Sequence, residues 1–330
     1  MDGYPAELRR LDGIVWTIIG AVAGAVLIAT VVSDFHLVWR SFLPGGAAVA
    51  LLLAGHWIYS TRRPDARLAN ALAVTAQIIA FGAVGAPLSY VAASFDLPLQ
   101  DRWTDGADRF VGPDWNALLH WTQAHAGLHP LFSLLYLSLL PQTVGVVLIL
   151  AVAQRFGQMR VFILATIFAT LIAIALATAV PAAGVWGYYH LRASEFSAMV
   201  PAVHGQYLPV FRGLRDGALR GLVGLGAQGI ITFPSLHAAL ALILIDAFGQ
   251  LRVLRWVALV ANGVMVLVVP IEGGHYFIDV LAGLVIAAVC LAAARLMVSR
   301  FVAVPQDLVS LVPTAEPDAA WVSRPVSSSQ

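Results

Sequence analysis

Long apolar runs alternate with short polar stretches along most of the chain. Eight runs approach the roughly 20 residues that a transmembrane helix needs, and the alternating pattern of a membrane β-barrel is missing. The predicted spans cover residues 13–32, 42–59, 68–93, 131–152, 161–180, 234–248, 253–269 and 275–297, with the third interrupted by Pro87. The pattern predicts an all-α, polytopic membrane bundle of about eight helices.

The polar stretches divide this bundle into four parts. Residues 1–93 hold the first three spans, and residues 94–130 form a loop rich in Trp and Asp that we expect at the membrane interface. Residues 131–300 hold the remaining five spans. Residues 301–330 are mixed in composition, with several Pro and a Ser-rich end, and are typical of a disordered tail.

Arginine placement predicts the orientation of the bundle. If eight spans alternate, one side collects most of the Arg residues that flank them: Arg9, Arg10, Arg62, Arg63, Arg67, Arg155, Arg160, Arg252, Arg255, Arg295 and Arg300. The positive-inside rule makes that side cytoplasmic. We therefore expect a multi-pass protein of the plasma or inner membrane, with both termini inside and the loops 94–130, 185–233 and 270–274 facing outward.

Composition narrows the function classes. The 330 residues are 60% hydrophobic and 11% charged, against about 25% charged in soluble domains. A net charge of +1 makes nucleic acid an unexpected partner. The single cysteine, Cys290, allows no internal disulfide. No small-residue cleavage site follows Arg9 and Arg10 after a short core, so the first apolar run is expected to be a retained span rather than a signal peptide.

Two polar motifs at span ends carry the candidate chemistry. In the first, Pro234 suits the first turn of a helix, whose free N–H groups form an anion site. Ser235 adds a hydroxyl donor, and His237 one turn later can donate a proton. A histidine at a helix start is, by itself, also typical of an interfacial or packed residue.

The second motif places His275 four residues before Asp279, on one helix face. An unpaired carboxylate one turn into the membrane is costly, which favours His275 as its partner. Such a pair fixes the imidazole tautomer and raises its nucleophilicity. The alternative is a structural pair that locks the helix end. Gly273 and Gly274 permit a close backbone approach to a ligand, and Gly283 permits close helix packing.

Arginines on the opposite side are the third candidate element. Arg212, Arg215 and Arg220 precede the first motif with only Asp216 among them. A phosphoryl group requires positive charge, which Arg supplies as a planar fork. Contacts with lipid headgroups are the alternative.

A histidine pair in the polar loop raises the question of a metal. His125 and His129 are four apart, as ligands on one helix face are. No acidic partner or further motif supports a metal there, so an interfacial helix with belt aromatics is the preferred interpretation. We expect no metal and no cofactor.

Together the two motifs resemble a known family. The residues Pro234-Ser235-Leu236-His237 and Gly274-His275-Tyr276-Phe277-Ile278-Asp279 are similar to those of the type 2 phosphatidic acid phosphatase superfamily, and look most like its inositol phosphorylceramide synthase-type branch. The resemblance covers roughly residues 131–297. It implies metal-independent phosphoryl transfer through a phospho-histidine, with His275 as nucleophile, Asp279 as its orienting partner, His237 as acid and Ser235 as a phosphate contact.

The chain departs from this family's pattern in its positive charges. The usual Lys and Arg-Pro of the first motif have no counterpart on the expected side, and Val268 and Val269 replace the usual Ser-Arg ahead of His275. Arg215 and Arg220, and Arg212 after them, are predicted to bind phosphate instead. Glu272 has no assigned role; it would orient a residue or contact a polyol acceptor.

The resemblance implies an enzyme that acts on a phosphorylated lipid among the membrane lipids, at the outer face. It is a lipid phosphatase if water is the acceptor, or a head-group transferase if an alcohol or polyol such as inositol is. A catalytically inactive lipid-binding membrane protein is the third hypothesis.

Overall fold

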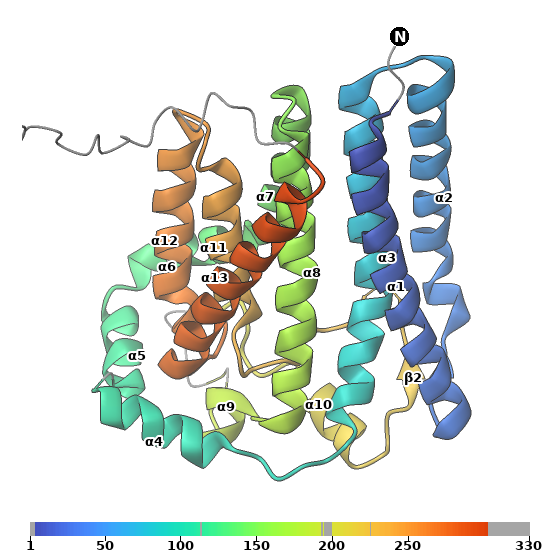
Figure 1. The fold of residues 1–330 in the computed structure, drawn as a ribbon. Coiled ribbons are helices and arrows are strands. Elements are labelled where there is room, and N and C mark those ends of the chain that lie inside the picture. The colour runs from blue at the N-terminus through green and yellow to red at the C-terminus, as the bar shows by residue number, and fades with distance from the viewer. Residues whose placement is uncertain (1–3, 113, 193, 195–199, 225, 303–330) are drawn as a thin grey trace, which may run out of the picture.

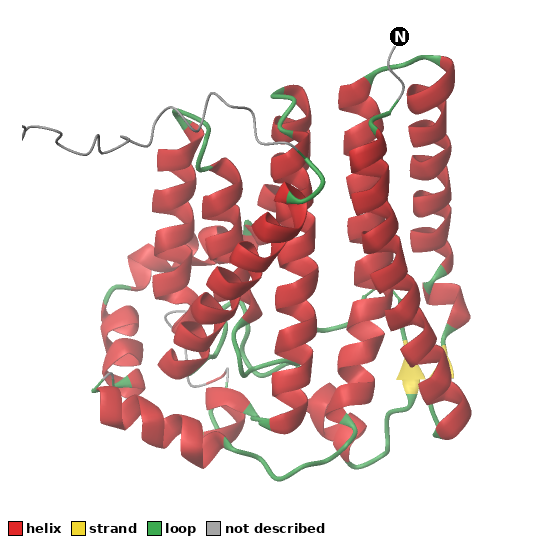
Figure 2. Ribbon diagram, viewed as in Figure 1, coloured by secondary structure: helices red, strands yellow, loops and turns green. Residues whose placement is uncertain are grey.

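The computed structural model describes residues 4–302 except 113, 193, 195–199 and 225 (Figure 1). In this part the protein is almost entirely helical (Figure 2). The predicted tail at residues 301–330 lies outside the described residues from 303 onward.

The helices follow one another with short connections. In chain order they are α1 Ala6–Val32, α2 Leu43–Trp57, α3 Ala66–Ala93, α4 Asp101–Val111, α5 Trp115–Ala124, α6 His129–Leu137, α7 Leu139–Val152, α8 Phe156–Ala179, α9 Gly184–Tyr188, α10 Leu208–Arg215, α11 Leu236–Phe248, α12 Leu254–Glu272 and α13 Phe277–Ser299. Short 3-10 turns cover Trp39–Ser41 (η1) and Ala126–Leu128 (η3), and a π-helical turn, Ile58–Arg62 (η2), extends α2.

Six helical segments are long and apolar enough to cross a membrane, so the chain is a multi-pass membrane protein. The first three helices, α8, α12 and α13 account for them. Large apolar side chains such as Leu51, Leu140 and Leu267 are more than 70% exposed on the outside of the bundle, as lipid-facing positions are. The fold class predicted from the apolar runs is confirmed.

The remaining two predicted spans differ from simple membrane helices. Residues 131–152 form α6 and α7, which meet at an angle of 47°. Pro141 explains the bend, because it has no N–H to give to the carbonyl of Leu137. The sixth predicted span is α11, which has only 13 residues and a length of about 20 Å at 1.5 Å per residue.

The predicted interruption at Pro87 was wrong. Helix α3 runs without a break from Ala66 to Ala93, with Pro87 buried inside it. Neighbouring helices and local adjustments accommodate proline inside membrane helices.

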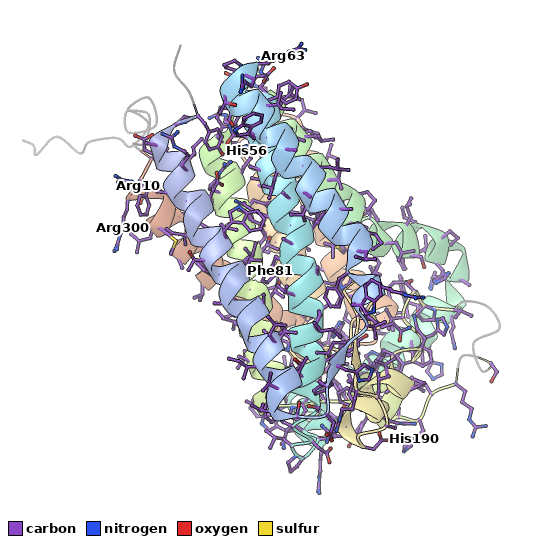
Figure 3. All side chains as sticks on the ribbon, turned by 90° about the vertical axis from the view of Figure 1, so that its right-hand side faces the viewer. Arg10, His56, Arg63, Phe81, His190 and Arg300 are labelled. Carbon is purple, nitrogen blue, oxygen red and sulfur yellow. The ribbon has the colours of Figure 1, made fainter. Side chains whose placement is uncertain are left out.

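The bundle has two polar ends. The N-terminus and the α2–α3, α7–α8 and α11–α12 connections lie at one end, and α4, α5, α9 and α10 gather at the other (Figure 1). In Figure 3, Arg10, Arg63 and Arg300 lie at the first end and His190 at the second. The arginine-rich connections therefore share one end of the molecule, which we call the arginine end; we call the other the loop end.

A strand pairing and a buried ion pair join helices α1–α3 to the rest of the chain. At the loop end, strand β1 (His36–Leu37) pairs in parallel with strand β2 (Gly221–Leu222), with His36 opposite Gly221. Towards the arginine end, Asp12 of α1 forms an ion pair of 3.0 Å with Arg160 of α8, whose side chain is completely buried. Gln77 of α3 also donates to Asp12, at 3.0 Å.

Helices α11 and α13 cross at very short range. A Cβ added at Gly283 of α13 would lie 2.2 Å from the carbonyl oxygen of Ser235, so only glycine fits there. The close packing predicted for Gly283 is confirmed, and it brings the starts of α11 and α13 together.

Candidate active site

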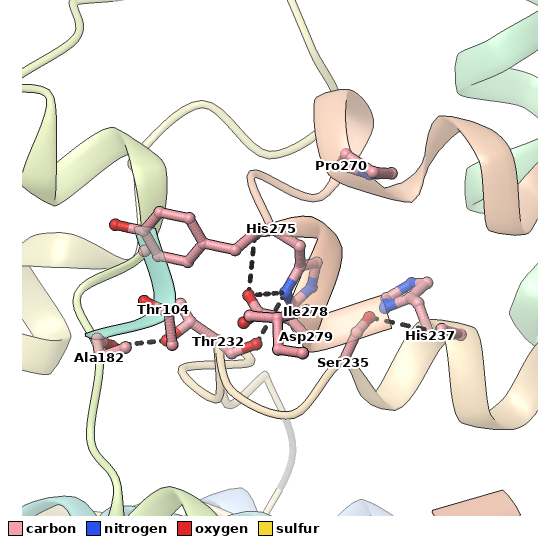
Figure 4. Close-up of polar contacts among 12 residues, drawn as sticks. Thr104, Ala182, Thr232, Ser235, His237, Pro270, His275, Ile278 and Asp279 are labelled. Atoms are coloured by element: carbon pink, nitrogen blue, oxygen red, sulfur yellow. Dashed lines mark hydrogen bonds and ion pairs between the residues drawn. The ribbon is translucent and has the colours of Figure 1, made fainter. Parts of the chain in front are cut away.

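The two sequence motifs meet at the loop-end side of the bundle, where α11, α12 and α13 come together (Figure 4). The backbone N–H of Ser235, which precedes α11, donates to the carbonyl of Asp279 in the first turn of α13 at 3.0 Å. The first motif is thereby attached directly to the second.

The ring of His275 is held by two acceptors on one nitrogen. Its Nδ1 lies 2.7 Å from the carbonyl oxygen of Thr232 and 3.3 Å from Oδ2 of Asp279 (Figure 4). A carbonyl oxygen only accepts, so Nδ1 carries the proton and donates. The other nitrogen, Nε2, is then unprotonated in the neutral ring, and no described residue donates to it. His275 is oriented as a nucleophile requires.

His275 and Asp279 do not share a helix, as their spacing had suggested. Helix α13 begins at Phe277, and His275 lies in the preceding loop. Asp279 reaches back because its Oδ2 also accepts from the N–H of Tyr276 at 2.9 Å, in the manner of a capping box. The helix start therefore fixes the carboxylate, and the carboxylate fixes the imidazole.

His237 lies in the first turn of α11. Its ring stacks on Tyr136 of α6, with ring centroids 4.2 Å apart, and its Nδ1 lies 3.3 Å from the hydroxyl of Tyr136. Tyr136 is buried, so this contact fixes the plane of the His237 ring.

Both histidines line one cavity of about 360 Å³. Its described polar lining is neutral and includes Tyr136, Gln206, Tyr207 and Gln228. Burial raises the pKa of the Tyr207 hydroxyl, so it stays protonated at neutral pH. The cavity can hold a polar group between the two histidines.

Buried carboxylates of α4 hold the loop that carries His275. Asp108 accepts from the N–H groups of Phe277 and Ile278, both at 2.8 Å, and so caps α13 from outside. Asp101 accepts from the N–H groups of Ala183 and Gly184 at 2.8 Å. Burial raises the pKa of both carboxyls, against the effect of these hydrogen bonds.

Tyr276 completes this support. Its hydroxyl donates to Asp101 at 3.1 Å, and the side chain is completely buried. Burial and the neighbouring Asp101 raise the pKa of Tyr276, which remains a donor. Helix α4 thus holds the three residues that follow His275 in the chain, Tyr276 to Ile278.

Glu272, which the sequence left without a role, ends α12 inside a buried network. Its Oε2 accepts from the hydroxyl of Ser133 and from the N–H of Ala202, both at 2.9 Å. Its Oε1 lies 3.4 Å from Nε2 of His129. Glu272 therefore joins α6, which carries Tyr136, to the cavity wall at Ala202.

The two histidines considered as metal ligands have separate partners. Nδ1 of His125 contacts the carbonyl of Trp121 at 2.8 Å, and its ring stacks on that indole. His129 belongs to the Glu272 network. Over the described ranges, no cluster of three His, Cys, Asp or Glu side chains is placed to hold a metal ion.

The two glycines before His275 pack against protein. A Cβ added at Gly274, which has a φ of +67°, would lie 2.5 Å from the indole of Trp186. Gly274 therefore allows close packing of the loop that carries His275. A Cβ added at Gly273, which also lines the cavity, would lie 2.7 Å from the ring of His275 and 3.0 Å from the hydroxyl of Tyr136.

Ser235 is completely buried and acts as the N-cap of α11, where its hydroxyl oxygen accepts from Ala238 at 3.4 Å. Helix α11 therefore begins at Leu236, two residues after Pro234.

The three predicted phosphate-binding arginines lie on or just after α10, and none is among the described residues that line the cavity. Arg215 donates to the carbonyl of Leu97 at 2.8 Å and pairs with Asp96 at 2.7 Å. Arg220 donates to the carbonyl of Leu214 at 2.7 Å and lies over the ring of Phe35.

Arg212 is exposed and forms no hydrogen bond or ion pair with the described residues. It follows Tyr207, which lines the cavity, by five positions. Of the three arginines, it is the one whose guanidinium is available to a ligand.

Sequence reasoning missed the groups that support the site. Asp101, Asp105 and Asp108 follow one another at helical spacing and so lie on one face of α4. This acidic face could have indicated that these carboxylates are buried and support the site. Tyr136 and the carbonyl of Thr232 gave no such signal, because they reach the histidines only through tertiary packing.

Comparison with known proteins places this geometry in a family. A model of the PAP2 superfamily matches residues 104–293, more than half of the chain. No curated protein and no solved structure matched the chain. The match spans His237, His275 and Asp279, as well as α4 from Thr104 onward. The chain belongs to the PAP2 superfamily, the type 2 phosphatidic acid phosphatases.

Proposed function

We propose that this chain is a membrane enzyme that transfers the phosphoryl group of a phosphorylated lipid through a phospho-histidine at the outer membrane face. One observation carries the proposal: the Nδ1 of His275 has two acceptors, so its Nε2 is free to attack within the cavity that His237 also lines.

The reaction has two steps. Nε2 of His275 attacks phosphorus, and the bond from phosphorus to the lipid oxygen breaks as His237 protonates that oxygen. An acceptor then attacks the phosphorus, its proton passes to His237, and Nε2 leaves. Asp279 stabilises the imidazolium-like phospho-histidine between the two steps. These steps need no metal ion.

The phosphate contacts are part of the proposal. Arg212 is the best candidate, because its charge has no partner among the described residues. Arg215 and Arg220 would have to leave carbonyl oxygens of the backbone to serve in this way. Ser235 would act through its hydroxyl hydrogen, since the oxygen already caps α11.

The acceptor distinguishes two activities. A phosphatase passes the group to water. The alternative, head-group transfer to an alcohol as in inositol phosphorylceramide synthases, is favoured by the neutral lining of the cavity, where Gln206, Gln228 and Tyr207 suit the hydroxyls of a polyol. An inactive lipid-binding protein is the remaining hypothesis.

The test uses purified protein in detergent with a chelator. Phosphatidic acid, a polyprenyl diphosphate and a phosphoinositide are offered with and without inositol, and released phosphate and inositol phosphate are measured. We expect turnover that is lost in His275→Ala and kept in His125→Ala, the matched control at the exposed histidine that follows α5. Phosphate release without inositol identifies a phosphatase. Inositol phosphate formed from phosphatidic acid only when inositol is present identifies a transferase, because the lipid leaves as its alcohol in the first step.

The hypothesis of an inactive lipid-binding protein predicts a different result. If lipid binds equally well to wild type and His275→Ala, and neither turns over any of the three lipids, the enzymatic proposal is wrong.

A further inference from the structure

A second cavity, of about 420 Å³, extends from the two histidines into the bundle. His237 and His275 line it, as they line the polar cavity. Its other walls come from α3, α7, α8, α11 and the loop at residues 227–231. The site thus has a polar cavity and this second space, which we call the apolar cavity.

The apolar cavity runs along the helices. On α3 its lining extends from Ser89, near the loop end, to Ile78, about 16 Å along the helix at 1.5 Å per residue. On α8 it extends from Ile174 to Phe162. Phe81, which also lines it, lies about midway between the two ends of the bundle (Figure 3). The cavity therefore reaches from the histidines towards the middle of the membrane.

Its lining is mostly hydrocarbon, apart from Gln228, the two histidines and the hydroxyl of Thr166, which has no hydrogen-bond partner among the described residues. The hydroxyls of Thr143 and Thr170 donate to carbonyls of their own helices, at 2.9 Å and 2.8 Å, and so offer the cavity little polarity. Leu240 and Leu244 of α11 and Phe162 of α8 supply further apolar surface. A cavity of this depth and chemistry suits one extended hydrocarbon chain.

One wall comes from outside the part of the chain that matches the family. Helix α3 ends at Ala93, and the family match begins at residue 104. Gly82 and Gly85 of α3 both line the cavity; Gly82 is exposed at its opening, and a Cβ added there meets no atom within 4 Å. The absence of side chains at these glycines keeps this wall open.

We propose that the apolar cavity binds one hydrocarbon chain of the lipid substrate, and that α3, through Gly82, sets the length of chain the enzyme accepts. The inference rests on the proposed function, because the histidines at the mouth define which end of the lipid carries the phosphoryl group. The specificity would then reside in a helix that lies outside the family match.

A binding test needs no turnover. Dodecyl phosphate with a photoreactive diazirine at the chain end is crosslinked to the His275→Ala protein, and the labelled peptides are identified. We expect label on α3 and α8 between residues 78–89 and 162–174. Label spread over the lipid-facing surface of α1 and α2 instead overturns the proposal.

A substitution tests the role of α3. Gly82→Leu fills the open space, so crosslinking to the α8 wall should fall roughly tenfold, the discrimination typical of filling a hydrophobic pocket. Gly20→Leu is the matched control, because Gly20 is an exposed helix glycine of α1 with the same open space and no place in the cavity. Equal labelling in both variants contradicts the proposal.

Turnover separates this inference from the proposed function. Octyl, dodecyl and hexadecyl phosphate are compared in wild type, Gly82→Leu and Gly20→Leu. We expect Gly82→Leu alone to lower kcat/KM roughly tenfold for the long chain relative to the short one. An unchanged ratio contradicts the chain-length role. If none of the lipid substrates turns over, the enzymatic proposal fails, and the crosslinking still decides what the cavity binds.

Discussion

At the scale of the residue, the ring of His275 has two hydrogen-bond acceptors. Asp279 supplies negative charge, and the carbonyl of Thr232, which is closer, also accepts from Nδ1. The two contributions are separable, because the carbonyl fixes the tautomer without adding a formal charge.

Asp279→Asn tests this separation. In a catalytic triad, the same change costs about ten-thousand-fold because the histidine adopts the wrong tautomer. Here Thr232 retains the tautomer, so we expect a smaller loss of kcat, of the order of a hundredfold, with KM little changed. Steady-state kinetics measure it. A loss as complete as that of His275→Ala would show that Thr232 does not hold the ring.

The sequence identified the candidate reactive side chains but only part of what holds them. His237, His275 and Asp279 were visible as motifs, and their convergence was expected from the family. The carbonyl of Thr232 is a backbone atom, which every residue has, so no side-chain pattern marks it. The predicted arginines show the converse: charge alone did not reveal that Arg215 and Arg220 bind backbone carbonyls.

At the scale of the element, α4 is a buried support for the start of α13. Loss of one helix cap typically costs about 1 kcal/mol. Asp108→Ala removes the partner of two N–H groups, so we expect a lower unfolding temperature and a lower kcat, because the loop holding His275 loosens. Asp114→Ala, which removes an exposed cap of α5, is the control and should leave kcat unchanged. Equal kcat in the two variants would refute the role of α4.

The pH dependence of stability gives an independent measure of Asp108. Burial raises its pKa above the ordinary value of 3.8, so between these two values the folded protein binds a proton that the unfolded chain does not. The stability of wild type relative to Asp108→Asn should therefore rise as the pH falls through this window. Thermal unfolding of both proteins over a pH series measures it, and a difference independent of pH would contradict burial of the charge.

Helices were predictable from the sequence where a periodic pattern or an apolar run extended over many residues. The six long helices follow from hydrophobicity alone. The angle between α6 and α7 and the shortness of α11 depend on how the chain packs around the site. The apolar runs therefore predicted where the fourth and sixth spans lie, but not the bend in the fourth or the short length of the sixth.

At the scale of the whole molecule, the Asp12–Arg160 pair is the buried link between α1 and α8. Removing one partner of a buried ion pair costs about 3–5 kcal/mol, because the other charge is stranded. We expect Asp12→Asn to destabilise the protein by about that amount, and the double variant Asp12→Leu, Arg160→Met to recover most of it. Thermal unfolding in detergent measures both.

The partly exposed pair Arg295–Asp246 is the control. Arg295 is 58% exposed, so Arg295→Ala should cost no more than about 1 kcal/mol. Equal costs for Arg295→Ala and Asp12→Asn would mean that the Asp12–Arg160 pair is hydrated. The sequence grouped Arg160 with the flanking arginines that set orientation, and its complete burial was not visible there.

The parallel pairing of His36–Leu37 with Gly221–Leu222 has a practical consequence for protein engineering. Helices α1–α3 are attached at both ends of the bundle, by this pairing and by Asp12, and both partners, residues 220–222 and Arg160, lie within the family segment. A chimera that exchanges the first three helices between family members would have to carry both partner regions with them. The N-terminal helices and the family segment are therefore coupled structurally, although only the latter carries the motifs.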